Sequence, residues 1–186
     1  MDSAIKAHLE LGGQPLLLRA LDRLGPQCGP LAVCAGPHSA RMPPLLSDAW
    51  AKVSVLDDAL PGHAGPLAGL LAALEWAAEA GLDDVLVVPV DTPFFPIDLG
   101  ERLRAKRGTA DAAIAADASG EQPALGLWRS PLASAVRCAL EQGGRSLGDF
   151  ARASGAVSVT FAERDAFLNI NRPEDLARAD AMLKQT

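Results

Sequence analysis

Apolar and polar positions follow two distinct patterns along this chain. Short apolar runs rich in valine and alanine predict strands, and longer stretches between them repeat their apolar positions with the period of a helix. Strands that alternate with helices are typical of βα units around a mostly parallel sheet, so the pattern predicts an α/β fold. The predicted strands are residues 31–35, 52–56, 84–90, 110–116, 123–128 and 156–161, and the predicted helices are 14–24, 44–50, 66–79, 97–106, 131–141, 147–153 and 172–184.

The pattern also predicts a single domain. No linker, internal repeat or low-complexity tract interrupts the alternation of strands and helices. A chain of 186 residues has the length of one ordinary domain with a full hydrophobic core. We therefore expect residues 1–186 to form one domain.

The composition of the chain limits which partners it could bind and indicates where in the cell it is located. The net charge of −6 leaves no basic field for nucleic acid or an anionic membrane. The three cysteines and three histidines lack metal-ligand spacing, which favours reduced cytoplasmic thiols and argues against a zinc site. The acidic amino terminus has no secretory core, and the longest uncharged run, residues 59–74, is too short to span a membrane. We expect a soluble cytoplasmic protein.

The change from apolar to acidic at Asp91 is a candidate for chemistry. Residues 85–90 are apolar throughout, which predicts a central strand covered by helices on both faces. Asp91 would then follow the carboxyl end of this strand, at the edge where α/β sheets bind ligands, and its carboxylate could hold a divalent cation. From position alone, a carboxylate that caps the following turn is an equally good interpretation.

A second acidic element precedes a loop rich in glycine and proline. Asp57 and Asp58 follow a predicted strand, and residues 61–69 then open a helix. Such a loop lets a ligand approach the backbone closely, and the helix amino terminus attracts an anion. Neither phosphate-loop fingerprint is present. Composition and spacing therefore permit a nucleotide site without proving one.

Three motifs, in this order, resemble the molybdenum cofactor guanylyltransferases of bacteria. They are D-D-x-x-x-x-x-x-G-P-L-A-G-L at 57–70, V-V-P-V-D-T-P-F-F-P at 87–96 and D-A-F-L-N-I-N-R-P-E-D-L at 165–176. The resemblance covers essentially the whole chain, and the third motif narrows it to the molybdopterin branch. It implies a Rossmann-like three-layer αβα fold of the nucleotide-diphospho-sugar transferase type. It also implies transfer of GMP from GTP to molybdopterin with Mg²⁺, release of pyrophosphate, and transient contact with molybdopterin-supplying proteins and molybdoenzymes.

The resemblance implies a role for each matching residue. Asp91 would bind Mg²⁺, and Asp58 and the Gly65-Pro66-Leu67 loop would contact the nucleotide. Lys6 would face the phosphates and offset the charge that builds in the transition state. Without the resemblance, Lys6 is interpreted more simply as a solvated lysine and Asp58 as a turn residue.

Asn169 and Asn171 would lie on the molybdopterin side of such a site. Asn171 also has a structural interpretation, because with Glu174 it matches a capping box at the start of the last predicted helix. Asn169 has no such reason, and it lies in an apolar segment that we expect near the core. We therefore favour Asn169 as the functional residue of the two.

The start of the chain departs from the family pattern. The family's amino-terminal strand and L-A-G-G-x-S-x-R-M-G loop are absent, and aligning Ile5-Lys6-Ala7 with the family's D-K-A places Met1 on the loop's methionine. An internal methionine taken as the start, a truncation, and a divergent relative without catalysis are three interpretations, and the coincidence at Met1 favours the first. Without that strand, we expect unpaired backbone groups inside the sheet and weak GTP binding.

Two further departures leave rival functions open. Cys34 stands where the family has an asparagine that meets the nucleotide, and Ile5 replaces an aspartate. Since a thiol is a weak hydrogen-bonding group, base recognition could differ. One rival is a molybdopterin cytidylyltransferase or another small-substrate nucleotidyltransferase. The other is a non-catalytic molybdopterin-binding or chaperone protein, against which the presence of Lys6, Asp58 and Asp91 counts.

Overall fold

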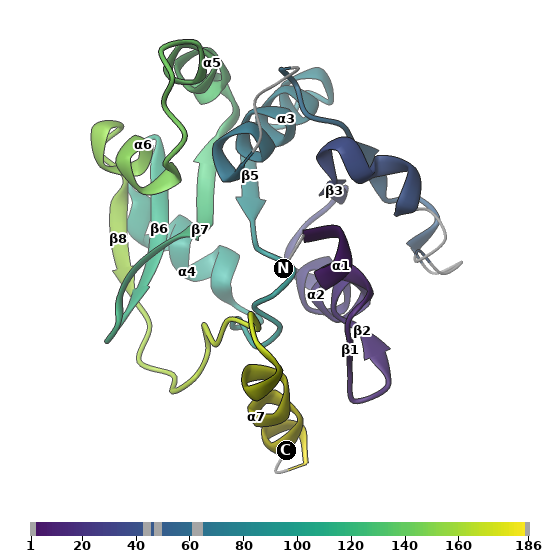
Figure 1. Ribbon diagram of the computed structural model, residues 1–186. Coiled ribbons are helices and arrows are strands. Elements are labelled where there is room, and N and C mark those ends of the chain that lie inside the picture. The colour runs from purple at the N-terminus through teal and green to yellow at the C-terminus, as the bar shows by residue number, and fades with distance from the viewer. Residues whose placement is uncertain (1–2, 43–45, 47–49, 61–64, 185–186) are drawn as a thin grey trace.

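The computed structural model describes residues 3–42, 46, 50–60 and 65–184, and its helices and strands alternate along the chain (Figure 1). The helices are α1 (Ser3–His8), α2 (Leu16–Leu24), α3 (Pro66–Glu79), α4 (Leu99–Arg107), α5 (Ala133–Glu141), α6 (Leu147–Ala153) and α7 (Pro173–Leu183), with short 3₁₀ turns at Gly25–Gln27, Gly36–Arg41 and Ser130–Leu132. The strands are β1 (Glu10–Leu11), β2 (Gln14–Pro15), β3 (Ala32–Cys34), β4 (Ser54–Leu56), β5 (Asp84–Val87), β6 (Ala112–Asp117), β7 (Gly120–Arg129) and β8 (Val157–Thr160).

The main sheet has four strands in the order β5-β7-β6-β8. Strand β7 is antiparallel to both β5 and β6, whereas β6 and β8 are parallel. Strands β5, β6 and β8 therefore run in one direction, and β7 is the reversed strand of a mostly parallel sheet. Strands β3 and β4 form a separate parallel pair, and α3 packs against both β3 and β5 (Figure 1).

The prediction that residues 85–90 form a central strand was wrong. Strand β5 ends at Val87, and within the described ranges β7 is its only strand partner. Pro89 lacks the N–H that a continued ladder would need, and the chain turns at Val90 and Asp91. Asp91 therefore lies in the turn after the strand. Within the described ranges, no strand pairs with both β3 and β5, so the β3–β4 pair is separate from the main sheet.

Helices cover both faces of the main sheet, as the alternation of side chains along β6 demonstrates. Ala112 and Ile114 pack into one apolar cluster with residues of α3, α5 and α6. Ala113 and Ala115 point to the opposite face and pack with residues of α2 and α4. All four of these alanine and isoleucine residues are at most 2% exposed. The result is the three-layer αβα arrangement that the sequence predicted.

Most helices agree closely with the sequence pattern, but two differences lie near the amino terminus, where helix α1 was not predicted. Helices α3 and α6 occupy their predicted ranges. Helix α2 begins at Leu16, because Gln14 and Pro15 pair with Glu10–Leu11 in a hairpin that the pattern did not predict. The helix predicted over 44–50 falls mostly outside the described residues. Of the helices described, none has the length and apolar character to cross a bilayer.

A nearly buried ion pair fixes the start of β5, the strand that leads to Asp91. The Arg107 guanidinium at the end of α4 donates to Asp84 Oδ1 at 2.5 Å, and the two side chains are 13% and 15% exposed. Arg104 Nε lies 3.7 Å from the other oxygen of Asp84 and is more exposed. The pair thus ties α4 to the strand that precedes the acidic turn.

Removal of this ion pair should destabilise the fold. Arg107→Ala leaves the Asp84 carboxylate desolvated and only partly compensated, so we expect a loss of about 2 kcal/mol in unfolding free energy. Arg152→Ala breaks an exposed ion pair with Asp149. The two side chains are 71% and 75% exposed, so this substitution should cost much less than Arg107→Ala. Urea denaturation of both variants measures the difference, and equal losses would contradict the role of Arg107.

Candidate active site

Lys6 lies at the centre of a polar cluster formed by three distant segments. Its Nζ donates a hydrogen bond to Asp91 Oδ2 at 2.6 Å and another to Asn171 Oδ1. The Lys6 and Asp91 side chains are 12% and 13% exposed, so both charges are largely removed from water. An ammonium has three N–H donors, and these contacts use two of them. The third remains able to meet an anionic ligand.

The surrounding backbone holds the three side chains in place. Lys6 is in the last turn of α1, and the neighbouring Ala7 is buried against α2. The carbonyl of Asp91 accepts a hydrogen bond from Ile170 N at 2.8 Å. Ile170 is 1% exposed and packs with Leu11 and residues of α7. The segment before α7 is therefore fastened directly to the turn that carries Asp91.

The prediction that Asn171 caps the last helix was wrong. The helix cap is one residue further on, at Arg172, and Asp175 Oδ2 accepts the backbone N–H groups of Asn171 and Arg172 at 3.0 and 2.9 Å. These bonds hold the pKa of the Asp175 carboxyl below its ordinary value. The Asn171 side chain is thus free to bind Lys6. Asn169, expected near the core, is exposed.

Asp91 is the acidic member of this cluster and has the chemistry of a magnesium ligand. Within the described ranges, no three His, Cys, Asp or Glu side chains converge as a ready-made metal site. Mg²⁺ does not require one, because it is commonly bound by one or two carboxylates together with waters and substrate phosphates. A single carboxylate beside a lysine therefore fits a metal that arrives with a nucleotide, and does not fit a permanently held structural ion.

A second group of candidate residues gathers where β3 and β4 end. Asp58 follows β4, and its carboxylate lies directly against the backbone of Gly36. Cys34, the last residue of β3, donates from Sγ to the Gly69 carbonyl at 3.3 Å in the first turn of α3. Gly65 precedes that helix with φ of 118°, and the helix begins at Pro66 as predicted. These contacts bring Asp58 and the predicted nucleotide loop to the same end of α3.

Cys34 has a protonated and weakly reactive thiol. Although the residue keeps solvent-exposed surface, the atoms crowded around Sγ desolvate a thiolate. This burial, and then the negative charge of Asp58, raise the pKa of the Cys34 thiol to about 11. The thiol therefore donates a hydrogen bond to the Gly69 carbonyl in its neutral form, and it does not offer a charged group to a ligand.

Neither of the pockets described is lined by Lys6, Asp91 or Asp58. A cavity of about 330 Å³ is lined by residues of α2, of α7 and of the segments after β5 and β8. It includes neither Lys6 nor Asp58. Asn171 lines a smaller apolar pocket of about 100 Å³, below the roughly 300 Å³ typical of ligand sites. The polar contacts, and not a deep cavity, identify the candidate site.

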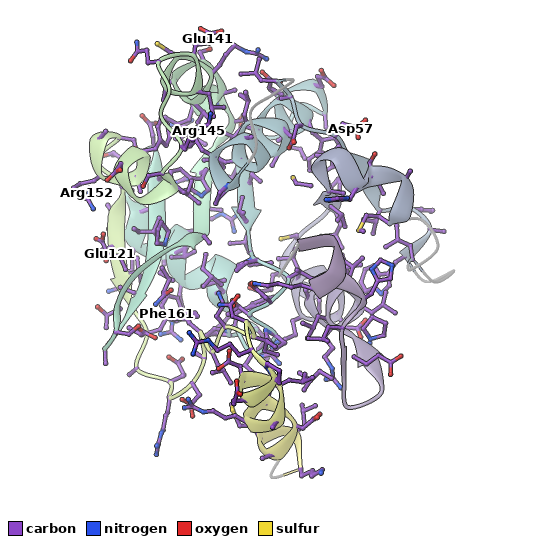
Figure 2. All side chains as sticks on the ribbon, in the orientation of Figure 1. Asp57, Glu121, Glu141, Arg145, Arg152 and Phe161 are labelled. Carbon is purple, nitrogen blue, oxygen red and sulfur yellow. The ribbon has the colours of Figure 1, made fainter. Side chains whose placement is uncertain are left out.

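Arg145 is a charged residue that lies apart from both clusters. It is exposed in the loop before α6, and Figure 2 shows it between α5 and α6, across α3 from Asp57. No hydrogen bond or ion pair is assigned to it among the described residues. Its position gives no contact with Lys6 or Asp91, so it is not part of either cluster.

The sequence identified the charged members of both clusters but not what holds them. Lys6, Asp91 and Asn171 are brought together, and Asp58 lies against Gly36, close to the contact between Cys34 and the first turn of α3. Asn169 makes no hydrogen bond within either cluster. Gly36 was missed, because its role depends on strand register and has no motif of its own. The sequence did contain one signal for Gly36: it follows the end of its strand by two residues, and Asp58 follows the end of the neighbouring strand by the same number.

Comparisons with known protein sequences match this chain over most or all of its length. A family model described as a MobA-like NTP transferase domain matches residues 1–156. A molybdenum cofactor guanylyltransferase of Cereibacter sphaeroides is 42% identical over 185 residues, which cover 100% of this chain and 91% of the relative. A relative of the same name from Mesorhizobium japonicum is 36% identical over 193 residues, covering 99% of this chain and 90% of the relative.

Solved structures resemble the fold over nearly the whole chain. Molybdopterin-guanine dinucleotide biosynthesis protein A from Archaeoglobus fulgidus has a TM-score of 0.78 at 23% identity, covering 97% of this chain and 91% of its own. The 2-C-methyl-D-erythritol 4-phosphate cytidylyltransferase of Thermus thermophilus has a TM-score of 0.69 at 21% identity, covering 97% and 95%. At these identities the likeness supports the nucleotidyltransferase fold alone.

The Cys34 thiol offers a chemical test of the second cluster. Since the Asp58 charge disfavours the thiolate, Asp58→Asn should lower the pKa of Cys34 and raise its alkylation rate severalfold at pH 8.5. The neighbouring exposed carboxylate provides a matched control, and Asp57→Asn should leave the rate unchanged. Iodoacetamide labelling followed by peptide mass spectrometry measures both rates. An equal effect of the two substitutions would contradict the assigned contact.

Proposed function

This chain belongs to the MobA-like NTP transferase family, among its molybdenum cofactor guanylyltransferases, and from that premise we propose that the Lys6 cluster is its catalytic centre. The chain is a nucleotidyltransferase whose reaction transfers GMP to molybdenum cofactor, with GTP and molybdopterin as substrates. The observation that carries the proposal is the convergence of Lys6, Asp91 and Asn171 from three distant segments. We propose further that residues 1–186 act as one nucleotidyltransferase domain.

The proposed reaction forms one phosphorus–oxygen bond and breaks another. An oxygen of the terminal phosphate of molybdopterin attacks the α-phosphorus of GTP, and the bond from that phosphorus to the pyrophosphate oxygen breaks. Such transfers depend on alignment and on stabilisation of negative charge, and they need no protein nucleophile. A site built from one lysine, one carboxylate and amide groups is adequate for this chemistry.

Lys6 supplies the positive charge in this proposal. Its ammonium is already held by Asp91 and Asn171, so little reorganisation is needed when phosphate oxygens approach its remaining donor. Low exposure strengthens that interaction, because water competes less for the charge. Asn171 orients Lys6 through its side-chain oxygen. The hydrogen bond that Asn171 N donates to Asp175 Oδ2 holds the Asn171 backbone in place.

Asp91 is the residue that would hold the metal. Enzymes of this type generally use a divalent cation, and we propose Mg²⁺. The cation supplies neutralisation of phosphate charge when it is bound. One Asp91 oxygen is engaged by Lys6, which leaves the other oxygen as the ligand.

Asp58 and the Gly65-Pro66-Leu67 loop form the nucleotide side of the proposed site. Pro66 is the first residue of α3, so Leu67 N–H belongs to the first turn and has no partner within the helix. Backbone donors and the partial positive charge at this end favour an anionic group. Asn169 is proposed on the molybdopterin side. The cytoplasmic location and contacts with molybdopterin-supplying proteins and molybdoenzymes stay predictions.

Substitutions in the Lys6 cluster should separate its members by role. Asp91→Ala should lower kcat/KM about a hundredfold or more, because both the metal ligand and the partner of Lys6 are lost. Asn171→Ala should lower kcat about tenfold, since Lys6 loses its orientation. Asn169→Ala, at an exposed residue proposed on the molybdopterin side, should raise KM for molybdopterin and leave GTP affinity unchanged. Steady-state assays of pyrophosphate release distinguish these outcomes, and three equal variants would contradict the assignment.

The choice of nucleotide tests the proposed reaction itself. With molybdopterin and Mg²⁺, GTP should support pyrophosphate release and dinucleotide formation at least about tenfold better than CTP, the margin of one good hydrogen-bonding contact. A preference for CTP would identify a cytidylyltransferase. Binding of molybdopterin without turnover of either nucleotide would favour a non-catalytic carrier.

A further inference from the structure

The register of β3 and β4 places Gly36 opposite Asp58. The two strands are parallel, and Cys34 is paired with Leu56. The ladder continues for one more step, because Ala35 N donates to the Leu56 carbonyl at 3.0 Å. Gly36 and Asp58 each lie two residues beyond the Cys34–Leu56 pair, so the chain brings them side by side as the strands end.

Gly36 is fitted closely to the Asp58 carboxylate. A Cβ at position 36 would lie 2.8 Å from Asp58 Oδ2, 3.0 Å from Oδ1 and 3.1 Å from Cγ. Gly36 is buried and has φ of 51°, a conformation that residues with a side chain rarely adopt. Two independent features, the missing side chain and the backbone conformation, therefore allow the carboxylate to occupy the space that a Cβ at position 36 would meet.

We infer that Gly36 is a positioning residue that sets the location of the Asp58 carboxylate for nucleotide binding. The inference rests on the proposed function, because Asp58 is a nucleotide-binding residue only within that proposal. Among the described residues, no side chain donates a hydrogen bond to Asp58, so its oxygens are directed by packing. Packing against Gly36 replaces the hydrogen bonds that usually fix a carboxylate, and it leaves both oxygens available to a ligand.

The expected consequence of a side chain at position 36 is local. The atoms that a new Cβ would meet belong to the far end of one short side chain, which can move without displacing the backbone. Gly36→Ala should therefore shift the Asp58 carboxylate while the β3–β4 pair persists. A side chain at position 36 also strains the backbone, which is a separate effect. Gly81→Ala is the matched control for backbone strain alone, since Gly81 has φ of 70° and open space at its Cβ position.

The experiment is a double-substitution cycle on GTP affinity with Mg²⁺ present. By isothermal titration calorimetry, Gly36→Ala should weaken GTP binding about tenfold, comparable with loss of a charged hydrogen bond. Gly81→Ala should leave the affinity unchanged. In an Asp58→Ala background, Gly36→Ala should cause no further loss, because its effect acts through the removed carboxylate. A full additional loss in that background overturns the inference.

A second measurement decides the inference without nucleotide. The iodoacetamide rate of Cys34, which faces Asp58, should change in Gly36→Ala and not change when Asp58→Ala is already present. The same change in both backgrounds, or none in either, overturns the positioning role. If the wild-type chain fails to bind GTP, the proposed function fails, while the thiol rates still determine whether Gly36 sets the position of Asp58.

Discussion

The contact between Lys6 and Asp91 is the interaction on which the site depends. It joins residues 85 positions apart in the sequence, and Asn171 extends the same contact to a residue 165 positions from Lys6. Two charges removed from water destabilise a protein unless each satisfies the other. Helix α1, the turn after β5 and the segment before α7 must therefore meet at one place. The same balanced charges are then ready to receive an anion and its metal.

A second constraint is the separation of the β3–β4 pair from the main sheet. Asp58 follows the β3–β4 pair, whereas Asp91 follows the main sheet, and no described strand connects them. Helix α3 packs against both β3 and β5, and its first turn accepts the Cys34 hydrogen bond. The relative placement of the two acidic residues consequently depends on this helix. Buried leucines and alanines along α3 supply the packing that holds it there.

Much of this arrangement could be predicted from local pattern, and the failures have physical reasons. Helix α3 was placed accurately because Gly65 and Pro66 signal its start and apolar residues fill its length. Strand β5 was predicted too long, since apolar character continues through residues that turn away after the strand. The capping role of Asn171 was wrong because Asp175, one residue past the expected glutamate, accepts the backbone donors. Exposure of Asn169 and the fit of Gly36 depend on tertiary contacts that no single motif encodes.

The central claim is that Asn171 acts by orienting Lys6. The most direct test is a double-mutant cycle that measures the coupling energy between these two residues in kcat. The four proteins required are the wild type, Lys6→Ala, Asn171→Ala and the double variant, each assayed for kcat with saturating GTP, molybdopterin and Mg²⁺. If Asn171 acts by orienting Lys6, the double variant should be no slower than Lys6→Ala alone. Losses that multiply in full would contradict the account, because the two residues would then act independently.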